Sequence, residues 1–164
     1  MALTKVQIGM TDAPTSGTAV TASGTSVDFN SIPATAKRIT VMFNGVSTNG
    51  SSNLLVQLGT SGGVVTSSYA SGCWGANTTN TGSSAGFIAT GLNGAGRTNY
   101  GMMIISSFGS NAWASIVNIF DASNNANNGA GVQTNLGGIL DRIRITTVNG
   151  TDIFDAGTIN IMYE

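Results

Sequence analysis

Few side chains in this sequence could take part in chemistry. The 164 residues include no histidine and one cysteine. The absence of histidine excludes Ser-His-Asp and Cys-His catalysis. Cys73 would need another activating group to act as a nucleophile, and its place beside Trp74 in SGCWGAN predicts a small apolar side chain instead. We therefore expect a protein that is not an enzyme and that needs no cofactor.

The acidic residues show no arrangement suited to acid–base catalysis. Asp152 and Asp155 are three apart on an expected strand, so they point to opposite faces and cannot flank one sugar ring. The segment DASNNANNG, from Asp121, has part of a calcium-loop pattern. It lacks the glycine at the sixth position and the glutamate at the twelfth, where Val132 stands. We expect an exposed polar loop there, and no metal site.

The composition suits recognition of neutral partners. Charged residues make up 8% of the chain and the net charge is −1, whereas about 25% charged residues is usual. A surface of Asn, Ser and Thr can hydrogen-bond sugars or proteins, but nucleic acid requires clustered Lys and Arg. We therefore expect no nucleic-acid partner, and a chain whose surface is partly covered in an assembly.

Two sets of residues are candidates for contacts with partners. Aromatic and amide side chains in Gly-rich stretches could meet a receptor or glycan: Trp74, Asn77, Asn80, Asn124 and Asn125. A second set could contact other subunits: Arg142, Arg144 and Met162. The two arginines share one strand face and could instead pair with Asp141 or Asp152. Trp113, on an alternating strand, is expected in the core or an interface.

Alternating apolar and polar residues predict the strands that position these side chains. The predicted strands are 37–44, 53–59, 99–107, 111–120, 141–147 and 158–163. Stretches rich in Gly, Asn and Ser, such as GANTTNTGSSAG and DASNNANNGAG, predict turns between them. The similar strings KRITVMFNG and DRIRITTVNG predict two similar hairpins that close on Asn-Gly, most strongly at Asn149-Gly150.

The whole predicts an all-β fold, a single antiparallel β-sandwich or jelly-roll-like domain over residues 18–164. Residues 1–17 are expected to form an arm that docks on a neighbour. Residues 157–163 are expected to be a central strand that holds the C-terminus. The start lacks the roughly 7–15-residue apolar core of a signal peptide, and no apolar run reaches the ~18 residues of a membrane span. We expect synthesis in a cytoplasm and no membrane insertion, and one cysteine excludes an intrachain disulfide.

Two segments resemble a β-rich module of tailed-bacteriophage structural proteins, which often occurs at the end of tail fibres. They are residues 26–63 and 140–164, and the strings RITVMFNGVSTNG and NGTDIFDAGTINI carry most of the resemblance. The resemblance implies a homo-oligomer, such as a trimer, in a virion that is assembled in the host cytoplasm and released by lysis. The arm would bind other virion proteins, and the loops would bind a host surface glycan or protein.

The short arm leaves a second interpretation open. A long fibre has an anchor and a shaft before its tip, whereas this chain has at most a short arm. The alternative to a tail-fibre protein that aids host adsorption is a decoration or cement protein that stabilises the phage head. A polysaccharide-cleaving enzyme is a third class, which the missing carboxylate pair disfavours.

Overall fold

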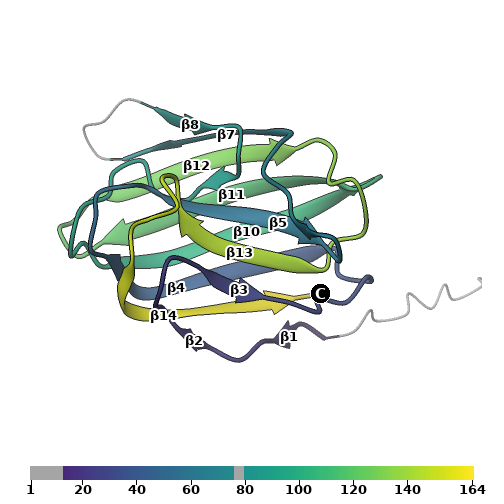
Figure 1. Cartoon of the computed structure of the whole chain (residues 1–164), viewed down its shortest axis with the longest axis horizontal. Helices are drawn as coiled ribbons and strands as arrows, with labels where there is room; N and C mark the ends of the chain where they lie inside the picture. Colours follow the sequence, from purple (N-terminus) through teal and green to yellow (C-terminus); the bar gives the residue numbers. More distant parts are fainter. Residues whose placement is uncertain (1–12, 76–79) are drawn as a thin grey trace, which may run out of the picture.

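The protein consists of two antiparallel β-sheets packed face to face (Figure 1). The structure is a computed structural model, and it describes residues 13–75 and 80–164. These residues contain no helix. The prediction of an all-β, antiparallel sandwich is confirmed.

The larger sheet has the order β1-β14-β4-β10-β11-β12-β7-β8, and β2 also pairs with β14. Its strands are β1 (Thr15–Ser16), β2 (Val20–Thr21), β4 (Arg38–Thr48), β7 (Tyr69–Trp74), β8 (Thr81–Ser83), β10 (Asn99–Gly109), β11 (Ala112–Asp121), β12 (Ala126–Gln133) and β14 (Phe154–Tyr163). The smaller sheet has the order β3-β13-β5-β6, and β9 also pairs with β5. Its strands are β3 (Val27–Phe29), β5 (Leu54–Thr60), β6 (Gly63–Val64), β9 (Phe87–Ile88) and β13 (Arg142–Thr147).

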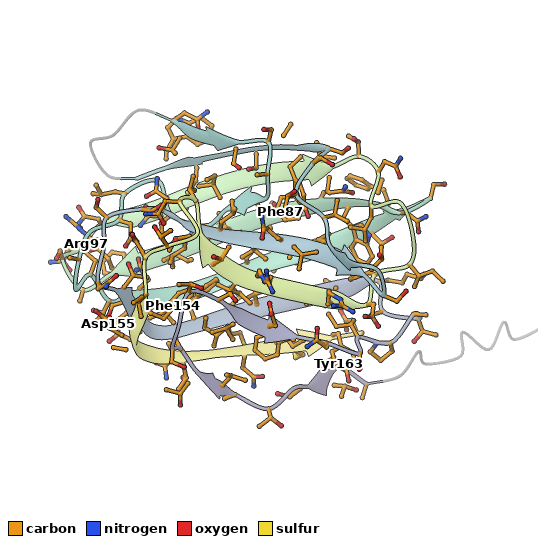
Figure 2. All side chains as sticks on the ribbon, viewed as in Figure 1. Phe87, Arg97, Phe154, Asp155 and Tyr163 are labelled. Atoms are coloured by element: carbon orange, nitrogen blue, oxygen red, sulfur yellow. The ribbon has the colours of Figure 1, made fainter. Side chains whose placement is uncertain are left out.

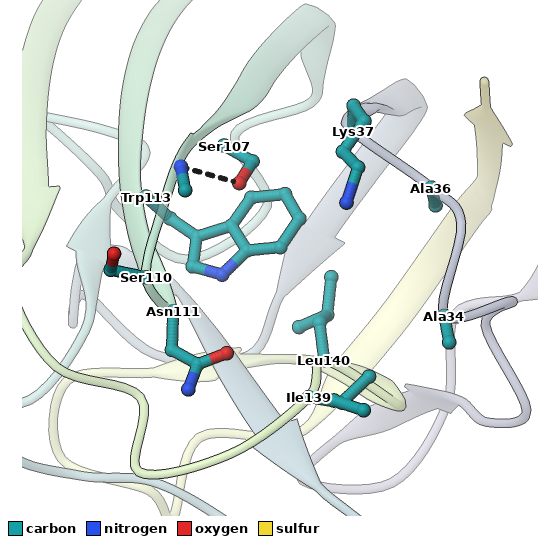
Figure 3. A pocket seen from close by; sticks show the side chains of 10 residues that line it. Ala34, Ala36, Lys37, Ser107, Ser110, Asn111, Trp113, Ile139 and Leu140 are labelled. Atoms are coloured by element: carbon teal, nitrogen blue, oxygen red, sulfur yellow. Dashed lines mark hydrogen bonds between the residues drawn. The ribbon is translucent and has the colours of Figure 1, made fainter.

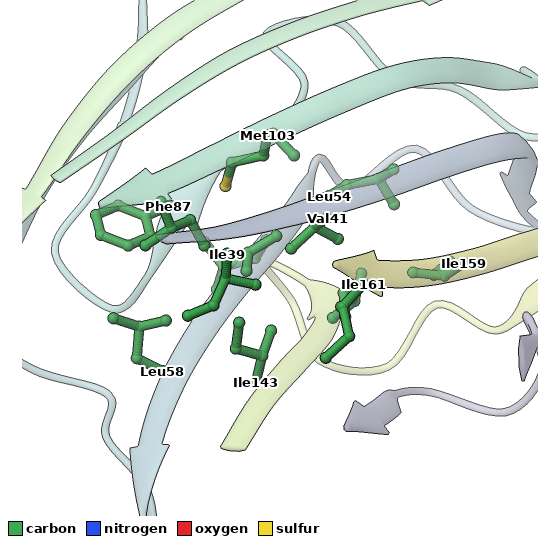
Figure 4. Close-up of a cluster of buried hydrophobic side chains, with 14 of the residues drawn as sticks. Ile39, Val41, Leu54, Leu58, Phe87, Met103, Ile143, Ile159 and Ile161 are labelled. Atoms are coloured by element: carbon green, nitrogen blue, oxygen red, sulfur yellow. The ribbon is translucent and has the colours of Figure 1, made fainter. Parts of the chain in front are cut away.

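The core lies between the two sheets because every second residue of a strand points inward. Ile39, Val41 and Met103 from the large sheet meet Leu58 and Ile143 from the small sheet, and all five side chains are fully buried (Figure 4). Burial of each such side chain stabilises the fold by about 1.5–3 kcal/mol. These contacts hold the two sheets together, and the opposite face of the large sheet lies outside this core.

The C-terminal strand lies inside the large sheet, as predicted. β14 pairs with β4 on one side and with the short β1 and β2 on the other. Ile159 and Ile161 are buried, and the backbone carbonyl of Glu164 accepts the N–H groups of Lys37 and Arg38. Thr15 and Ser16, the last part of the expected arm, also belong to this sheet, whereas residues 1–12 lie outside the described residues.

The two predicted Asn-Gly hairpins are wrong. Gly150 does form a turn, with φ at +69° and its N–H bonded to the Thr147 carbonyl. However, β13 and β14 belong to different sheets, so this turn crosses the sandwich and closes no hairpin. Gly45, with φ at +67°, lies inside β4 at a bulge, where the register with β14 shifts. An Asn-Gly pair indicates only a positive φ, and a bulge or a crossing turn uses that conformation as readily as a hairpin does.

Two polar stretches that were predicted to be turns contain strands. GANTTNTGSSAG includes β8, and DASNNANNGAG includes most of β12. In β12 polar residues alternate between the faces, and Asn127 is fully buried. Burial is possible there because the Asn127 side-chain oxygen accepts the backbone N–H groups of Gly91 and Leu92.

Candidate interaction surface

The face of the large sheet that points away from the small sheet carries exposed apolar side chains. We call it the outer face. Its large apolar residues are 45–61% exposed: Trp74, Tyr100, Met102, Ile116 and Phe120. The alternation of each strand explains their orientation, since Met103 and Cys73, the neighbours of Met102 and Trp74, are buried in the core. The outer face therefore combines aromatic and aliphatic groups on a rigid support.

Cross-strand pairing arranges these side chains in rows. One row runs Met42–Met102–Asn118–Asn128–Trp74 across β4, β10, β11, β12 and β7. It spans roughly 19 Å, because neighbouring strands are about 4.8 Å apart. The Asn118 side-chain amide donates to Asn128 Oδ1 at 2.8 Å. The row is thus apolar over β4 and β10, and it carries amide and indole groups over β11, β12 and β7. We call these two parts the apolar side and the amide–indole side.

A parallel arrangement of apolar pairs extends the apolar side. Ile104 lies opposite Ile116, and Tyr100 lies opposite Phe120. Directly opposed side chains in antiparallel strands pack against each other. The apolar side of the outer face is therefore continuous along β10, whereas on β11 the polar Asn118 separates Ile116 from Phe120.

The outer face is almost free of charge. Among the outward side chains of β4, β7, β10, β11 and β12, Arg38 carries the one formal charge. It forms an ion pair with Glu164 at one end of the face. Exposed apolar side chains that are grouped on one face are typical of contact surfaces, and a face with little charge suits a neutral partner.

The structure brings two of the predicted receptor residues together. Trp74 is exposed, as predicted, although it is the last residue of β7 and not part of a loop. The Asn80 side chain lies against Gly72, where a Cβ would come within 2.6 Å of Asn80 Oδ1. Gly72 and Trp74 are two residues apart on the same face, so Asn80 lies on the amide–indole side. Asn77 lies outside the described residues.

Asn124 and Asn125 occupy the turn between β11 and β12, at the end of the sandwich where Figure 2 shows Arg97 and Asp155. Asn124 is exposed, with φ at +64°. The Asn125 side-chain amide donates to the Asp121 carboxylate at 3.0 Å. Asn125 therefore holds its own turn, and Asn124 is the freer of the two for a partner.

Asp121 organises this turn from a fully buried position. Its carboxylate accepts the backbone N–H groups of Ser123 and Asn125 and forms an ion pair with Arg97. Burial by itself would raise the pKa of Asp121, but the hydrogen bonds from Asn125, Arg97 and Ser123 together lower it. Protein donors thus occupy the oxygens that a calcium loop would turn toward an ion. No group of three potential metal ligands occurs in residues 13–75 and 80–164.

The predicted subunit contacts do not form one patch. The Arg144 guanidinium donates two hydrogen bonds to the Asp28 carboxylate, each at 2.8 Å, and this pairing raises the pKa of the guanidinium. Arg142 pairs with Asp141, as one alternative predicted, whereas Asp152 accepts the Ser52 N–H. Both arginines lie on the small sheet, but Met162 lies on β14 of the large sheet.

Two predictions about buried residues are confirmed. Cys73 is fully buried, and burial raises the pKa of its thiol to about 11. Trp113 is 5% exposed and packs in the core. Neither side chain is accessible enough to act on the outer face.

Sequence reasoning missed Met102, Ile116 and Phe120 as surface residues. Alternation places Tyr100 and Met102 on one side of their strand, but Met103 on the other side is also apolar. A strand that is apolar on both sides does not reveal which side faces the core.

No helix in the described part of the chain is long and apolar enough to cross a membrane. Neither a protein-family model nor a curated protein matches the sequence.

Proposed function

We propose that the protein is a non-enzymatic structural protein of a tailed-phage particle, of the tail-fibre type, which is displayed on the particle surface and contributes to host adsorption. The outer face carries this proposal, because an exposed, uncharged, partly aromatic sheet face suits contact with other molecules. The phage setting comes from the resemblance of residues 26–63 and 140–164. The location in the virion is part of the same proposal.

The amide–indole side would bind a neutral host glycan or a polar protein surface. The Trp74 indole offers an exposed ring face, and Asn80 adds an amide beside it. The bond from Asn118 to Asn128 leaves Asn118 Oδ1 and Asn128 Nδ2 for partner hydroxyl groups. An apolar ring flanked by amides is suited to sugars, which combine C–H faces with hydroxyls.

The apolar side would form the subunit contact of a homo-oligomer, for which we propose a trimer. Ile116, on β11, is 61% exposed and lies opposite Ile104, and Met102 and Phe120 lie farther along the same two strands. Burial of these side chains between subunits would release water from apolar surface without leaving a charge unpaired. The N-terminal arm, residues 1–17, would bind other virion proteins.

The acidic side chains are engaged in contacts within the fold, which supports a role without catalysis. Each acidic side chain of the described residues has a partner within the fold: Asp28, Asp121, Asp141 and Glu164 have arginines, Asp152 has Ser52 and Asn149, and Asp155 has Ser47. A general acid or base must be free to exchange protons with a substrate. Release of reducing ends from host polysaccharide by the purified protein would overturn this part of the proposal.

Phage particles that carry Trp74→Ala test the receptor side. We expect adsorption to host cells to fall about tenfold, since an aromatic contact contributes about 0.5–1.5 kcal/mol and several copies act together. Particle yield should not change, because Trp74 is exposed. Phe108→Ala is the matched control, since Phe108 is another exposed aromatic, on β10 at the end toward β11. Equal adsorption of the Trp74 variant and the wild type would reject the receptor assignment.

The second candidate function is decoration of the phage head, which the apolar side of the outer face favours. An apolar surface suits a permanent contact with shell proteins, because permanent interfaces are more hydrophobic than transient ones. Particles without this protein would then adsorb normally but break at a lower temperature. Antibody labelling of intact particles separates the candidates, because a fibre protein labels the tail and a decoration protein labels the head.

A further inference from the structure

A cavity of about 110 Å³ lies at the end of the sandwich where β10 turns into β11. It is formed by three segments that are far apart in the sequence: residues 34–37 before β4, residues 107–113 around the β10–β11 turn, and residues 139–140 before β13 (Figure 3). β10 separates this end from the Arg97 end, since the strand begins at Asn99 and ends at Gly109. The cavity is therefore distinct from the Asn124 turn.

An unpaired hydrogen-bond donor faces this cavity. Trp113 is 5% exposed, and its Nε1 has no hydrogen-bond partner. Figure 3 shows the ring nitrogen turned toward the space between Asn111 and Leu140. A buried N–H without an acceptor destabilises a protein, because it has lost its hydrogen bond to water. A ligand atom that accepts this hydrogen bond would remove that cost.

An unpaired cation lines the same cavity. Among the Lys and Arg side chains that the structure describes, the four arginines each have a carboxylate partner, and Lys37 has none. Lys37 extends into the cavity toward the Trp113 ring (Figure 3). The lining includes no acidic residue. A cation and an N–H donor without a counter-charge together favour an anion that accepts hydrogen bonds.

The walls of the cavity are fixed by the backbone. The Ser107 N–H donates to the Lys37 carbonyl at 2.8 Å, and the Leu136 N–H donates to the Asn111 carbonyl at 3.0 Å. Ser110 and Asn111 both adopt positive φ angles, 51° and 60°, a conformation that is unfavourable for most residues other than glycine. The backbone around Trp113 is thus held in position before a ligand arrives, which reduces the entropy lost on binding.

We propose that this cavity binds the carboxylate of an acidic sugar. A volume of about 110 Å³ is enough for several water molecules, so the cavity admits a carboxylate group. The carboxylate accepts from Trp113 Nε1 and faces Lys37. The sugar ring stays at the rim, where the exposed Ser110 and Asn111 meet its hydroxyls.

The indole N–H resonances of the ¹⁵N-labelled protein test this site directly. The chain has two tryptophans, so Trp74→Phe assigns both resonances. We expect D-glucuronate to shift the Trp113 resonance and not that of Trp74, and D-glucose to shift neither. No shift with glucuronate, or an equal shift with glucose, would overturn the proposal. Acetate that binds as tightly as glucuronate would support the carboxylate contact and refute the role of the sugar ring.

Substitutions show which groups hold the ligand. Lys37→Met should weaken glucuronate binding roughly tenfold, which corresponds to about 1.4 kcal/mol. Lys37 is exposed, so this variant will fold. Arg38→Met is the matched control, because it removes the neighbouring charge, which is not part of the cavity; it should bind like the wild type. Unchanged affinity in the Lys37 variant would overturn the proposal. The isolated protein suffices here, so the result does not depend on host adsorption.

Discussion

Gly157→Ala should strongly destabilise the fold at the paired bulges of β4 and β14. Gly157 has φ at +88°, and a Cβ there would lie 2.4 Å from the backbone carbonyl of Gly45 and 2.6 Å from the Val46 nitrogen. A left-handed conformation costs alanine about 1–2 kcal/mol, and displacement of packed backbone costs about 1–3 kcal/mol more. We expect a loss of roughly 3 kcal/mol from a total free energy of unfolding of about 5–15 kcal/mol.

Gly150→Ala is the matched control for this substitution. Gly150 also has a positive φ, +69°, but no atom lies within 4 Å of its Cβ position. Only the conformational cost applies, so the loss should be about 1 kcal/mol. Urea unfolding with an unchanged dependence on denaturant concentration measures both losses. Equal losses in the two variants would refute the argument, because they would show that the approach of β4 to β14 contributes nothing.

Three further predictions concern buried ionisable groups. The folded protein lowers the pKa of Asp121, so the stability that this carboxylate contributes is complete above its unfolded pKa of about 3.9 and is lost as the pH falls through the folded value. The free energy of unfolding of Asp121→Asn, measured with urea, should therefore fall less steeply with acid than that of the wild type. An equal dependence on pH in the two proteins would contradict this. Since the pKa of Cys73 is about 11, Ellman's reagent should label it at neutral pH only after denaturation; rapid labelling of the folded protein would show an accessible thiolate. The Tyr69 hydroxyl accepts a hydrogen bond from the buried Leu58 N–H at 2.8 Å, and burial raises the pKa of this hydroxyl to about 12. Tyr69→Phe should lower the free energy of unfolding by about 1–3 kcal/mol, measured with urea. An unchanged free energy of unfolding would mean that water replaces the hydroxyl.

The strands could be predicted from the sequence, but their pairing could not. Alternation identifies β4, β10 and β11 because a half-buried strand repeats every two residues. Alternation does not specify partners, so the separation of β13 and β14 into different sheets was missed. Asn149-Gly150 looked like a hairpin because the dipeptide encodes only the local backbone angle.

The candidate sites were predictable only in part, for a similar reason. Trp74 could be identified because small polar residues surround it in the sequence. Met102 could not, because its neighbour Met103 is equally apolar and only the packing of the small sheet decides which one is buried. The juxtaposition of Lys37 and Trp113 depends on three segments that meet at one end of the sandwich, and no local pattern encodes it.

The edges of the large sheet limit how copies of this protein can associate. Within the described residues, the edge strands β1 and β8 contain two and three residues. An unpaired strand of that length offers too few free backbone groups to template a strand from another molecule. The sheet is therefore protected against open-ended growth along its hydrogen-bonding direction. Copies that meet through the outer face, as proposed, would instead stack side chain against side chain, and rotational symmetry would close such an assembly after a fixed number of subunits.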